Sequence, residues 1–120
     1  MTGAAAAGSD WERRAESFLR NQGLRPLARN FSCRLGELDL ILLDGGCVVF
    51  TEVRYRRDTR HGTGAETVTP AKQQRLLRTA RVWLQRHRRH ARLPCRFDVV
   101  SMCHRNGSLE VDWIRNAFTA

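Results

Sequence analysis

The segment 36–57 constrains the fold more strongly than any other part of the chain, because it has the pattern of a β-hairpin. Two apolar runs flank Asp44, Gly45 and Gly46, and Asp-Gly or Gly-Gly at the centre of a two-residue loop is a strong hairpin signal. Both faces of the two strands are apolar near the turn, so we expect helices on both sides of the sheet. The hairpin therefore predicts an α/β fold.

Helical periodicity and capping residues predict two helices around this hairpin. Ser9 followed by Glu12 is a capping-box pattern, so we expect the first helix to cover about 10–22. Thr69 followed by Pro70 is typical of an N-cap and a first-turn proline, and this pair opens the second helix. The two helices would supply the layers that cover the sheet.

Three further segments complete the expected architecture. Segment 24–34 carries a proline and predicts an edge strand or an extended lead-in, 96–102 predicts another strand, and 108–118 a last short strand or helix. The predicted order is α-β-β-β-α-β plus a short C-terminal element, in a mixed sheet flanked by helices. We expect residues 1–9 to be a disordered tail and 10–120 to form one domain, since this length suits a single core.

The charge of the chain points to an anionic partner. There are 21 Lys and Arg residues against 12 Asp and Glu, a formal charge of +9 and a sequence pI near 11.1, a balance that favours binding to nucleic acid. No apolar stretch approaches the roughly 18 residues that cross a bilayer, and the N-terminus lacks the pattern of a signal peptide. We therefore expect a soluble cytoplasmic protein with no membrane partner.

Three carboxylates, Glu37, Asp39 and Glu52, interrupt the apolar hairpin. If the two glycines form the loop, Asp39 faces Glu52; if the loop begins one residue earlier, Glu37 faces it. In either register the three acids share one face, where directly opposed like charges are destabilising. At about 5 Å and an effective dielectric constant of about 20, two carboxylates repel by roughly 3 kcal/mol, so a cation must offset the repulsion.

The offsetting cation has two candidates, and the spacing leaves both open. A Mg²⁺ ion suits hard carboxylate oxygens on neighbouring strands, whereas Arg54 could form a purely structural ion network with Asp39 and Glu52. Arg56 and Arg57 follow, and then a helix with a basic exposed face, so an anionic backbone would be drawn to this place. A metal beside cations supports phosphodiester hydrolysis, which makes a nuclease the favoured interpretation.

The segments "GELDLI", "VFTEVR" and "RFDVV" resemble the YraN-like family of uncharacterised bacterial proteins. The similarity extends upstream to "ERRAESFL" and downstream to Lys72, so it spans nearly everything after the tail. It implies the restriction-endonuclease-like PD-(D/E)XK fold, with a layout similar to archaeal Holliday-junction resolvases. It further implies DNA as substrate and Mg²⁺ or Mn²⁺ as cofactor, and it leaves a homodimer open.

The resemblance also implies roles for individual residues. Asp39 matches the metal-binding aspartate and Glu52 the acid of the E-x-K element, with the Val53 carbonyl as an additional ligand. Glu12 falls where resolvase-like relatives place a first-helix glutamate near the metal. Arg54 stands in place of the family's lysine. An arginine stays charged and cannot serve as a general base, although it can stabilise charge that develops on phosphate.

These features support one leading hypothesis and two alternatives. The leading hypothesis is a nucleic-acid-binding protein that cuts branched or structured DNA with Mg²⁺. The first alternative is a catalytically inactive DNA- or RNA-binding module in which Arg54 neutralises the hairpin carboxylates; the second is an adaptor whose basic face binds an acidic protein. The residues expected to contact phosphates are Arg56, Arg57, Lys72, Arg75 and Arg78.

Overall fold

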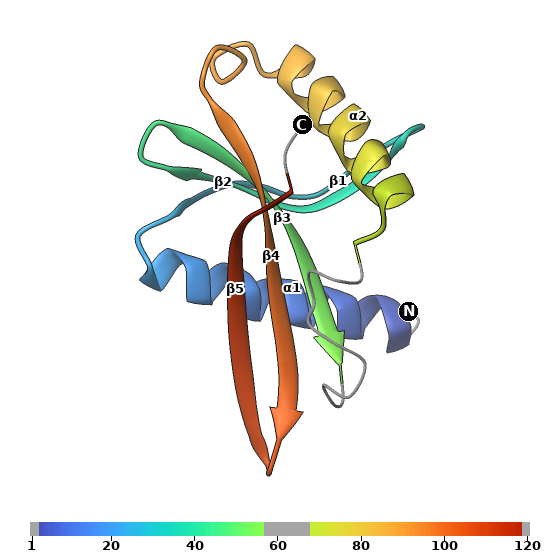
Figure 1. Ribbon diagram of the computed structural model, residues 1–120, viewed down its shortest axis with the longest axis vertical. Helices are drawn as coiled ribbons and strands as arrows, with labels where there is room; N and C mark the ends of the chain where they lie inside the picture. Colours follow the sequence, from blue (N-terminus) through green and yellow to red (C-terminus); the bar gives the residue numbers. More distant parts are fainter. Residues whose placement is uncertain (1–2, 57–67, 119–120) are drawn as a thin grey trace.

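The computed structural model describes residues 3–56 and 68–118, with only the backbone of 3–9. These residues form one five-stranded sheet and two helices (Figure 1). The elements are α1 (Gly3–Asn21), β1 (Arg25–Cys33), β2 (Gly36–Asp44), β3 (Cys47–Arg56), α2 (Pro70–Arg86), β4 (Cys95–Arg105) and β5 (Ser108–Phe118). The expected α/β class is confirmed, and the last element is a full strand.

The strands lie in the sheet in the order in which they follow one another along the chain. All neighbouring pairs are antiparallel except β3 and β4, which are parallel and are joined by the connection that contains α2. In the β2–β3 hairpin, Asp44 pairs with Cys47 and Leu40 with Thr51. The loop therefore consists of the two glycines, so the register in which Asp39 is aligned with Glu52 is the correct one of the two.

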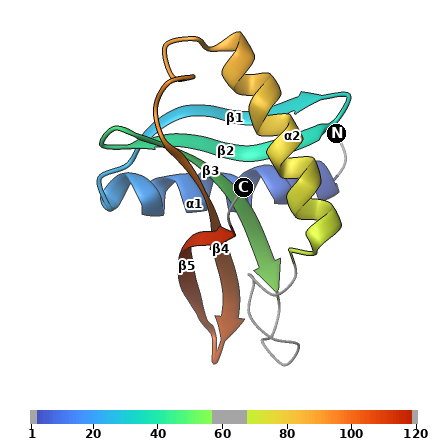
Figure 2. The same cartoon turned by 45° about the horizontal axis from the view of Figure 1, so that its top comes forward.

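The two helices cover opposite faces of the sheet (Figures 1 and 2). The α1 face buries Ala15 and Leu19 with Leu40, Leu42, Val49, Val100 and Met102. The α2 face buries Leu76, Ala80 and Trp83 with Ile41, Val48, Phe50, Phe97 and Val99. The prediction that helices cover both sides of the hairpin is confirmed. Neither helix of the described chain has the length and apolarity that a bilayer-spanning helix needs.

The start of α1 differs from the prediction. The helix begins at Gly3, so the expected start at residue 10 was wrong, and Ser9 lies inside the helix instead of at its N-cap. The alanines at the N-terminus have the highest helix propensity of any residue, which explains the longer helix. The division of the chain into a tail at 1–9 and a domain at 10–120 stays a prediction.

The start of α2 agrees with the prediction. Thr69 has an extended backbone and its hydroxyl accepts a hydrogen bond from the Lys72 amide at 3.2 Å, while Pro70 occupies the first turn. Such a cap satisfies one of the amides that the first turn of a helix leaves unpaired. The cap therefore fixes where α2 begins, and with it the position of Lys72 relative to the sheet.

Candidate functional site

The candidate site lies where β2 and β3 stop pairing. Their backbone pairing ends at Leu40 and Thr51, and Asp39 and Glu52 are the next residues beyond it. There the Asp39 carboxylate accepts a hydrogen bond from the backbone N–H of Val53 at 2.8 Å. The side chain thus satisfies an amide that no longer meets a carbonyl of the neighbouring strand. This bond holds Asp39 at the point where the two strands separate.

Three carboxyl groups from three elements meet at this point. Glu12 of α1 and Glu52 of β3 each lie close enough to Asp39 of β2 to share a proton with it, and Asn30 of β1 lies near Glu12. Glu37 is close enough to act on Glu12 electrostatically. The structure therefore brings together Glu12, Asp39 and Glu52, which the sequence assigned to one metal site.

The surroundings disfavour negative charge on two of these carboxyl groups. Burial, followed by the hydrogen bond and charge of Asp39, raises the pKa of Glu52 from 4.5 to about 8, although Lys72 and Arg54 act in the opposite direction. Burial, followed by the charge of Asp39, raises the pKa of Glu12 from 4.5 to about 7. Carboxylates that repel one another in a partly buried place gain the most from an added cation.

The ion-pair partner of Glu52 is Lys72, the single lysine of the chain. Its Nζ lies 3.5 Å from Glu52 Oε2, and the two side chains are 29% and 11% exposed. Among the described residues, Arg54 forms no ion pair with Asp39 or Glu52, and its Nε is buried without a hydrogen-bond partner. The cation that pairs with Glu52 therefore comes from the first turn of α2 and not from position 54 of β3.

A stacked pair of rings sets the position of Glu12. Trp11 lies parallel to Tyr55 of β3 with ring centroids 3.9 Å apart, and the Tyr55 hydroxyl is 2.7 Å from His104 Nδ1 on β4. Trp11 is partly buried against the α1-side core, as expected for a packing residue. Because Glu12 follows Trp11 directly, this stack fixes the middle of α1, from which Glu12 approaches Asp39.

A small cavity opens beside the Glu52–Lys72 pair. Its volume is about 220 Å³, and the residues that line it are Gly36, Glu37, Glu52, Lys72, Arg75 and Leu76. Gly36 has a φ of +148°, and a Cβ atom there would lie 3.0 Å from Thr79 Oγ1 of α2. A glycine is therefore needed for α2 to approach β2 this closely. The cavity gives a ligand access to two carboxylates, Glu37 and Glu52, and two cations, Lys72 and Arg75.

The donor set can be compared with what a divalent cation requires. No group of three or more His, Cys, Asp and Glu side chains in the described part of the chain is arranged to hold a metal ion as it stands. Mg²⁺, however, usually takes one or two protein carboxylates and completes its coordination with water and substrate phosphate. Asp39 and Glu52, with a cavity beside them, fit that pattern. The Val53 carbonyl as a further ligand stays a prediction.

The residues predicted to contact phosphates are placed as follows. Lys72 and Arg75 line the small cavity, and Arg78 is exposed one turn further along α2. Arg56 lies at the end of β3, partly buried and already engaged with a neighbouring group. Arg57 lies outside the described residues. Among the described members of this set, Lys72 and Arg75 therefore lie at the cavity beside Glu52.

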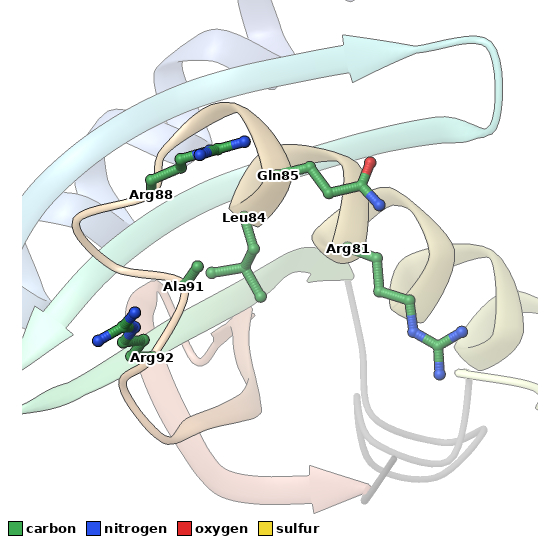
Figure 3. A pocket seen from close by; sticks show the side chains of 6 residues that line it. All are labelled: Arg81, Leu84, Gln85, Arg88, Ala91 and Arg92. Carbon is green, nitrogen blue, oxygen red and sulfur yellow. The ribbon is translucent and has the colours of Figure 1, made fainter.

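A second and larger cavity lies at the opposite end of α2 (Figure 3). Its volume is about 770 Å³, and the residues that line it are Arg81, Leu84, Gln85, Arg88, Ala91 and Arg92. Among the described residues, no carboxylate contributes to its lining, and none of the residues predicted for the site does. This cavity is the larger of the two. Glu52 and Lys72, which could take part in catalysis, however, line the smaller one.

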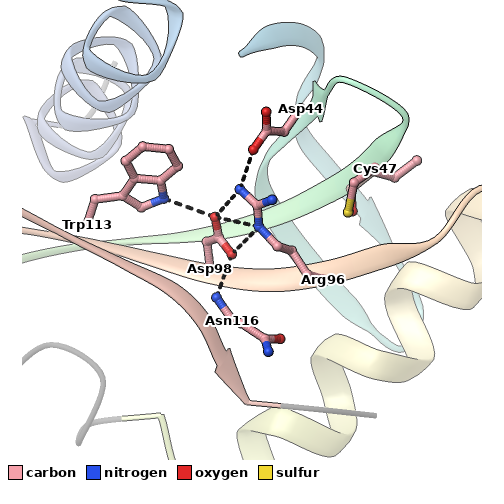
Figure 4. Close-up of polar contacts among 7 residues, drawn as sticks. Asp44, Cys47, Arg96, Asp98, Trp113 and Asn116 are labelled. Atoms are coloured by element: carbon pink, nitrogen blue, oxygen red, sulfur yellow. Dashed lines mark hydrogen bonds and ion pairs between the residues drawn. The ribbon is translucent and has the colours of Figure 1, made fainter. Parts of the chain in front are cut away.

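A fourth carboxylate, Asp98 of β4, belongs to a different arrangement (Figure 4). It is 1% exposed and accepts hydrogen bonds from Arg96 Nε at 3.0 Å, Trp113 Nε1 at 2.9 Å and the Asn116 amide at 2.9 Å. Arg96 in turn lies 2.9 Å from Asp44 at the end of β2. A buried charge with this many partners is satisfied, so Asp98 ties β4 to β2 and β5.

The sequence matches the profile described as uncharacterised protein family UPF0102 over residues 11–102. The chain belongs to this family. The matched segment contains Glu12, Asp39, Glu52 and Lys72 and ends within β4. The predicted membership of a family of uncharacterised bacterial proteins is confirmed, whereas a relation of UPF0102 proteins to nucleases stays a prediction.

Several bacterial UPF0102 proteins are similar over most of their length. One from Stutzerimonas stutzeri is 49% identical over 118 residues, which are 98% of each chain. Another from Alkalilimnicola ehrlichii is 51% identical over 94% of this chain and 86% of its own. A third from Chromohalobacter salexigens is 50% identical over 94% and 90%, respectively. The chain therefore corresponds to nearly the whole of these relatives.

Proposed function

We propose that this protein binds nucleic acid and cleaves phosphodiester bonds at the cavity beside Glu52 and Lys72, with Mg²⁺ or Mn²⁺ as cofactor. The observation that carries the proposal is the convergence of Glu12, Asp39 and Glu52 beside that cavity. Carboxyl groups with raised pKa values, next to cations in a cleft, are characteristic of functional sites. The resemblance to resolvases adds branched or structured DNA as the substrate class.

Each side chain has its own part in the proposed reaction. Asp39 and Glu52 would hold the divalent cation, which supplies an activated water and offsets charge on the phosphoryl oxygens. The Val53 amide keeps Asp39 in one orientation, so the carboxylate need not reorganise when the ion arrives. Lys72 lies 3.5 Å from Glu52, from where it can orient the attacking water. Unlike an arginine, it can also lose a proton.

The arginines around the site would bind the nucleic-acid backbone. Arg75 shares the cavity with Lys72, and Arg78 continues the basic surface along α2. Contacts of this kind position a nucleic acid without reading its sequence. Each neutralised phosphate releases counterions, so binding should weaken steeply as the salt concentration rises.

A cleavage assay tests this proposal. Purified protein is incubated with duplex, single-stranded and four-way-junction DNA, with and without Mg²⁺ or Mn²⁺. We expect metal-dependent cutting by the natural protein, and its loss in the Asp39→Asn, Glu52→Gln and Lys72→Gln variants. Asp112→Asn and Glu110→Gln are matched controls, because both residues are exposed on β5; these variants should keep the activity.

Substitutions of Arg54 and Lys72 decide which cation matters for cutting. If Lys72 takes the part of the family's lysine, Arg54→Gln should cut more slowly than the natural protein but remain active, whereas Lys72→Gln should not. Restored cutting only in an Arg54→Lys variant would show instead that the lysine is required on β3. Cutting that survives Asp39→Asn would contradict the proposed site.

A second function, nucleic-acid binding without cleavage, is favoured by one observation. Glu52 is already balanced by Lys72 at 3.5 Å, and its raised pKa of about 8 lets it hold a proton near neutral pH. The carboxylates can therefore exist without a metal, with Lys72 as the neutralising cation in place of Arg54, which was expected to have that role. Salt-sensitive binding of DNA or RNA by the natural protein and all variants, with no cutting by any, would support this function.

A further inference from the structure

The larger cavity at the end of α2 combines apolar and positively charged side chains. Leu84 projects from the last turns of the helix toward Ala91, which lies on the segment that folds back after it (Figure 3). Arg81 lies on one side of these two residues, and Arg88 and Arg92 on the other. The hollow thus has an apolar centre with guanidinium groups around it.

The three arginines are available to a ligand. All are exposed, and within the described residues none of them takes part in an ion pair. Like charges gathered around a low-dielectric hollow concentrate a positive potential there. A ligand that fits must therefore carry several anionic groups beside an apolar body.

An acidic protein segment meets this requirement better than a nucleic acid does. Proteins that bind exposed bases stack them on aromatic rings, and no aromatic side chain of the described part of the chain lines this cavity. Leu84, Ala91 and the aliphatic stems of the arginines offer instead a surface for an aliphatic or aromatic side chain. The guanidinium groups match carboxylates, which they can bind through two parallel hydrogen bonds.

We propose that this cavity docks an acidic segment of another protein, whose leucine or phenylalanine side chain enters the hollow while its Asp and Glu residues pair with Arg81, Arg88 and Arg92. The volume of about 770 Å³ falls within the roughly 300–1,000 Å³ of typical ligand pockets. It has room for more than one apolar side chain. The occupant is thus an acidic peptide with an apolar anchor.

This docking surface is separate from the carboxylate site. Positions 72 and 81 of α2 differ by nine residues, which corresponds to about 13 Å along the helix axis and about half a turn around it. A partner at Arg81 would therefore leave Lys72 and Glu52 open. The protein could hold an acidic partner and a nucleic acid at the same time, as an adaptor with a separate reactive site.

Fluorescence anisotropy with a labelled peptide of several aspartates followed by leucine and phenylalanine tests the proposal. We expect salt-sensitive binding that weakens when the two apolar residues become serine, and also when the aspartates become asparagine. Ala91→Glu and Arg88→Ser should each weaken it roughly tenfold or more, about 1.4 kcal/mol. Arg89→Ser is the matched control, because Arg89 is exposed on the same segment but does not line the cavity.

Three outcomes would overturn the docking proposal. Equal binding of the serine peptide, or equal loss in Arg89→Ser, would mean that only diffuse charge attracts the probe. Absence of binding to the full chain would remove the site. Displacement of the probe by single-stranded or duplex DNA, together with loss of DNA binding in Ala91→Glu, would assign the cavity to the nucleic-acid surface. Circular dichroism of each variant confirms that it is folded.

Discussion

Asp98 and the carboxyl groups gathered around Asp39 have opposite surroundings in the same domain. Asp98 is surrounded by donors: the Arg96 guanidinium, the Trp113 indole and the Asn116 amide. Glu12 and Glu52 have other carboxyl groups as neighbours, and their pKa values are raised to about 7 and about 8. A carboxylate whose lone pairs are used by the fold stabilises the fold, whereas carboxyl groups that face one another resist becoming negatively charged.

The strongest test of this contrast is Asp98→Ala. Removing the carboxylate leaves Arg96 as a charge that is only partly compensated by Asp44 and leaves the Trp113 N–H unpaired. Breaking a buried pair in this way costs about 3–5 kcal/mol, so urea unfolding should show a loss of that size. Asp112→Ala, on the exposed side of β5, should change stability by less than about 0.5 kcal/mol. A loss below about 1 kcal/mol for Asp98→Ala would mean that Asp98 contributes little to the stability of the fold, which would contradict this contrast.

The pH dependence of stability should reveal the raised pKa of Glu52. Its pKa rises from 4.5 to about 8 in the folded protein, so the folded state binds more protons than the unfolded state between these values. The free energy of unfolding therefore falls as the pH rises through this window, by a few kcal/mol. We expect Glu52→Gln to remove most of this fall in urea unfolding between pH 5 and pH 8.5, and Glu110→Gln to leave it unchanged.

Divalent cations should relieve the same repulsion. At pH 8 and a Mn²⁺ or Mg²⁺ concentration of about a hundred times Kd, binding to the folded state alone adds about 2.7 kcal/mol to its stability. Asp39→Asn and Glu52→Gln should lose this gain. Asp112→Asn should keep it, because that residue lies outside the site. Titration calorimetry in buffers of different ionisation enthalpy should also detect proton release on binding, since a ligating carboxylate must be deprotonated. No heat and no stabilisation would exclude the metal.

Features set by neighbouring residues could be predicted from the sequence, whereas contacts between distant elements could not. The hairpin follows from local chemistry, because its glycines admit the left-handed conformation that Gly45 adopts, with φ +60°. The cap at Thr69 is equally local. These signals predicted that Asp39 and Glu52 share one face of the hairpin and located the start of α2, but they left two registers open, and the structure decided between them. They could not place Lys72 beside Glu52, since that contact depends on how α2 packs across the sheet.

Asp98 could not be interpreted from the sequence for a related reason. Its carboxylate oxygens accept hydrogen bonds from Trp113 and from the backbone N–H of Asn116, both on β5. These contacts depend on the register of β4 and β5, which is irregular between Phe97 and Val99. A single acid in an apolar strand gives no signal of such partners. The convergence of Glu12 with the hairpin was expected from family resemblance alone, because no spacing within α1 reveals which strand lies beneath it.

The smallest expected effect concerns Lys72. Its ammonium is partly exposed and lies 3.5 Å from Glu52, so Lys72→Met should change stability by no more than about 1 kcal/mol. The pKa of Glu52 should nevertheless rise above its present value of about 8, because Lys72 is the larger of the two cationic influences that lower it and Arg54 the smaller. Carboxyl NMR titration should therefore show a greater upward shift in Lys72→Met than in Arg54→Met. The reverse order would mean that Arg54 is the main counter-charge of this site, as in the hypothesis of an inactive binding module.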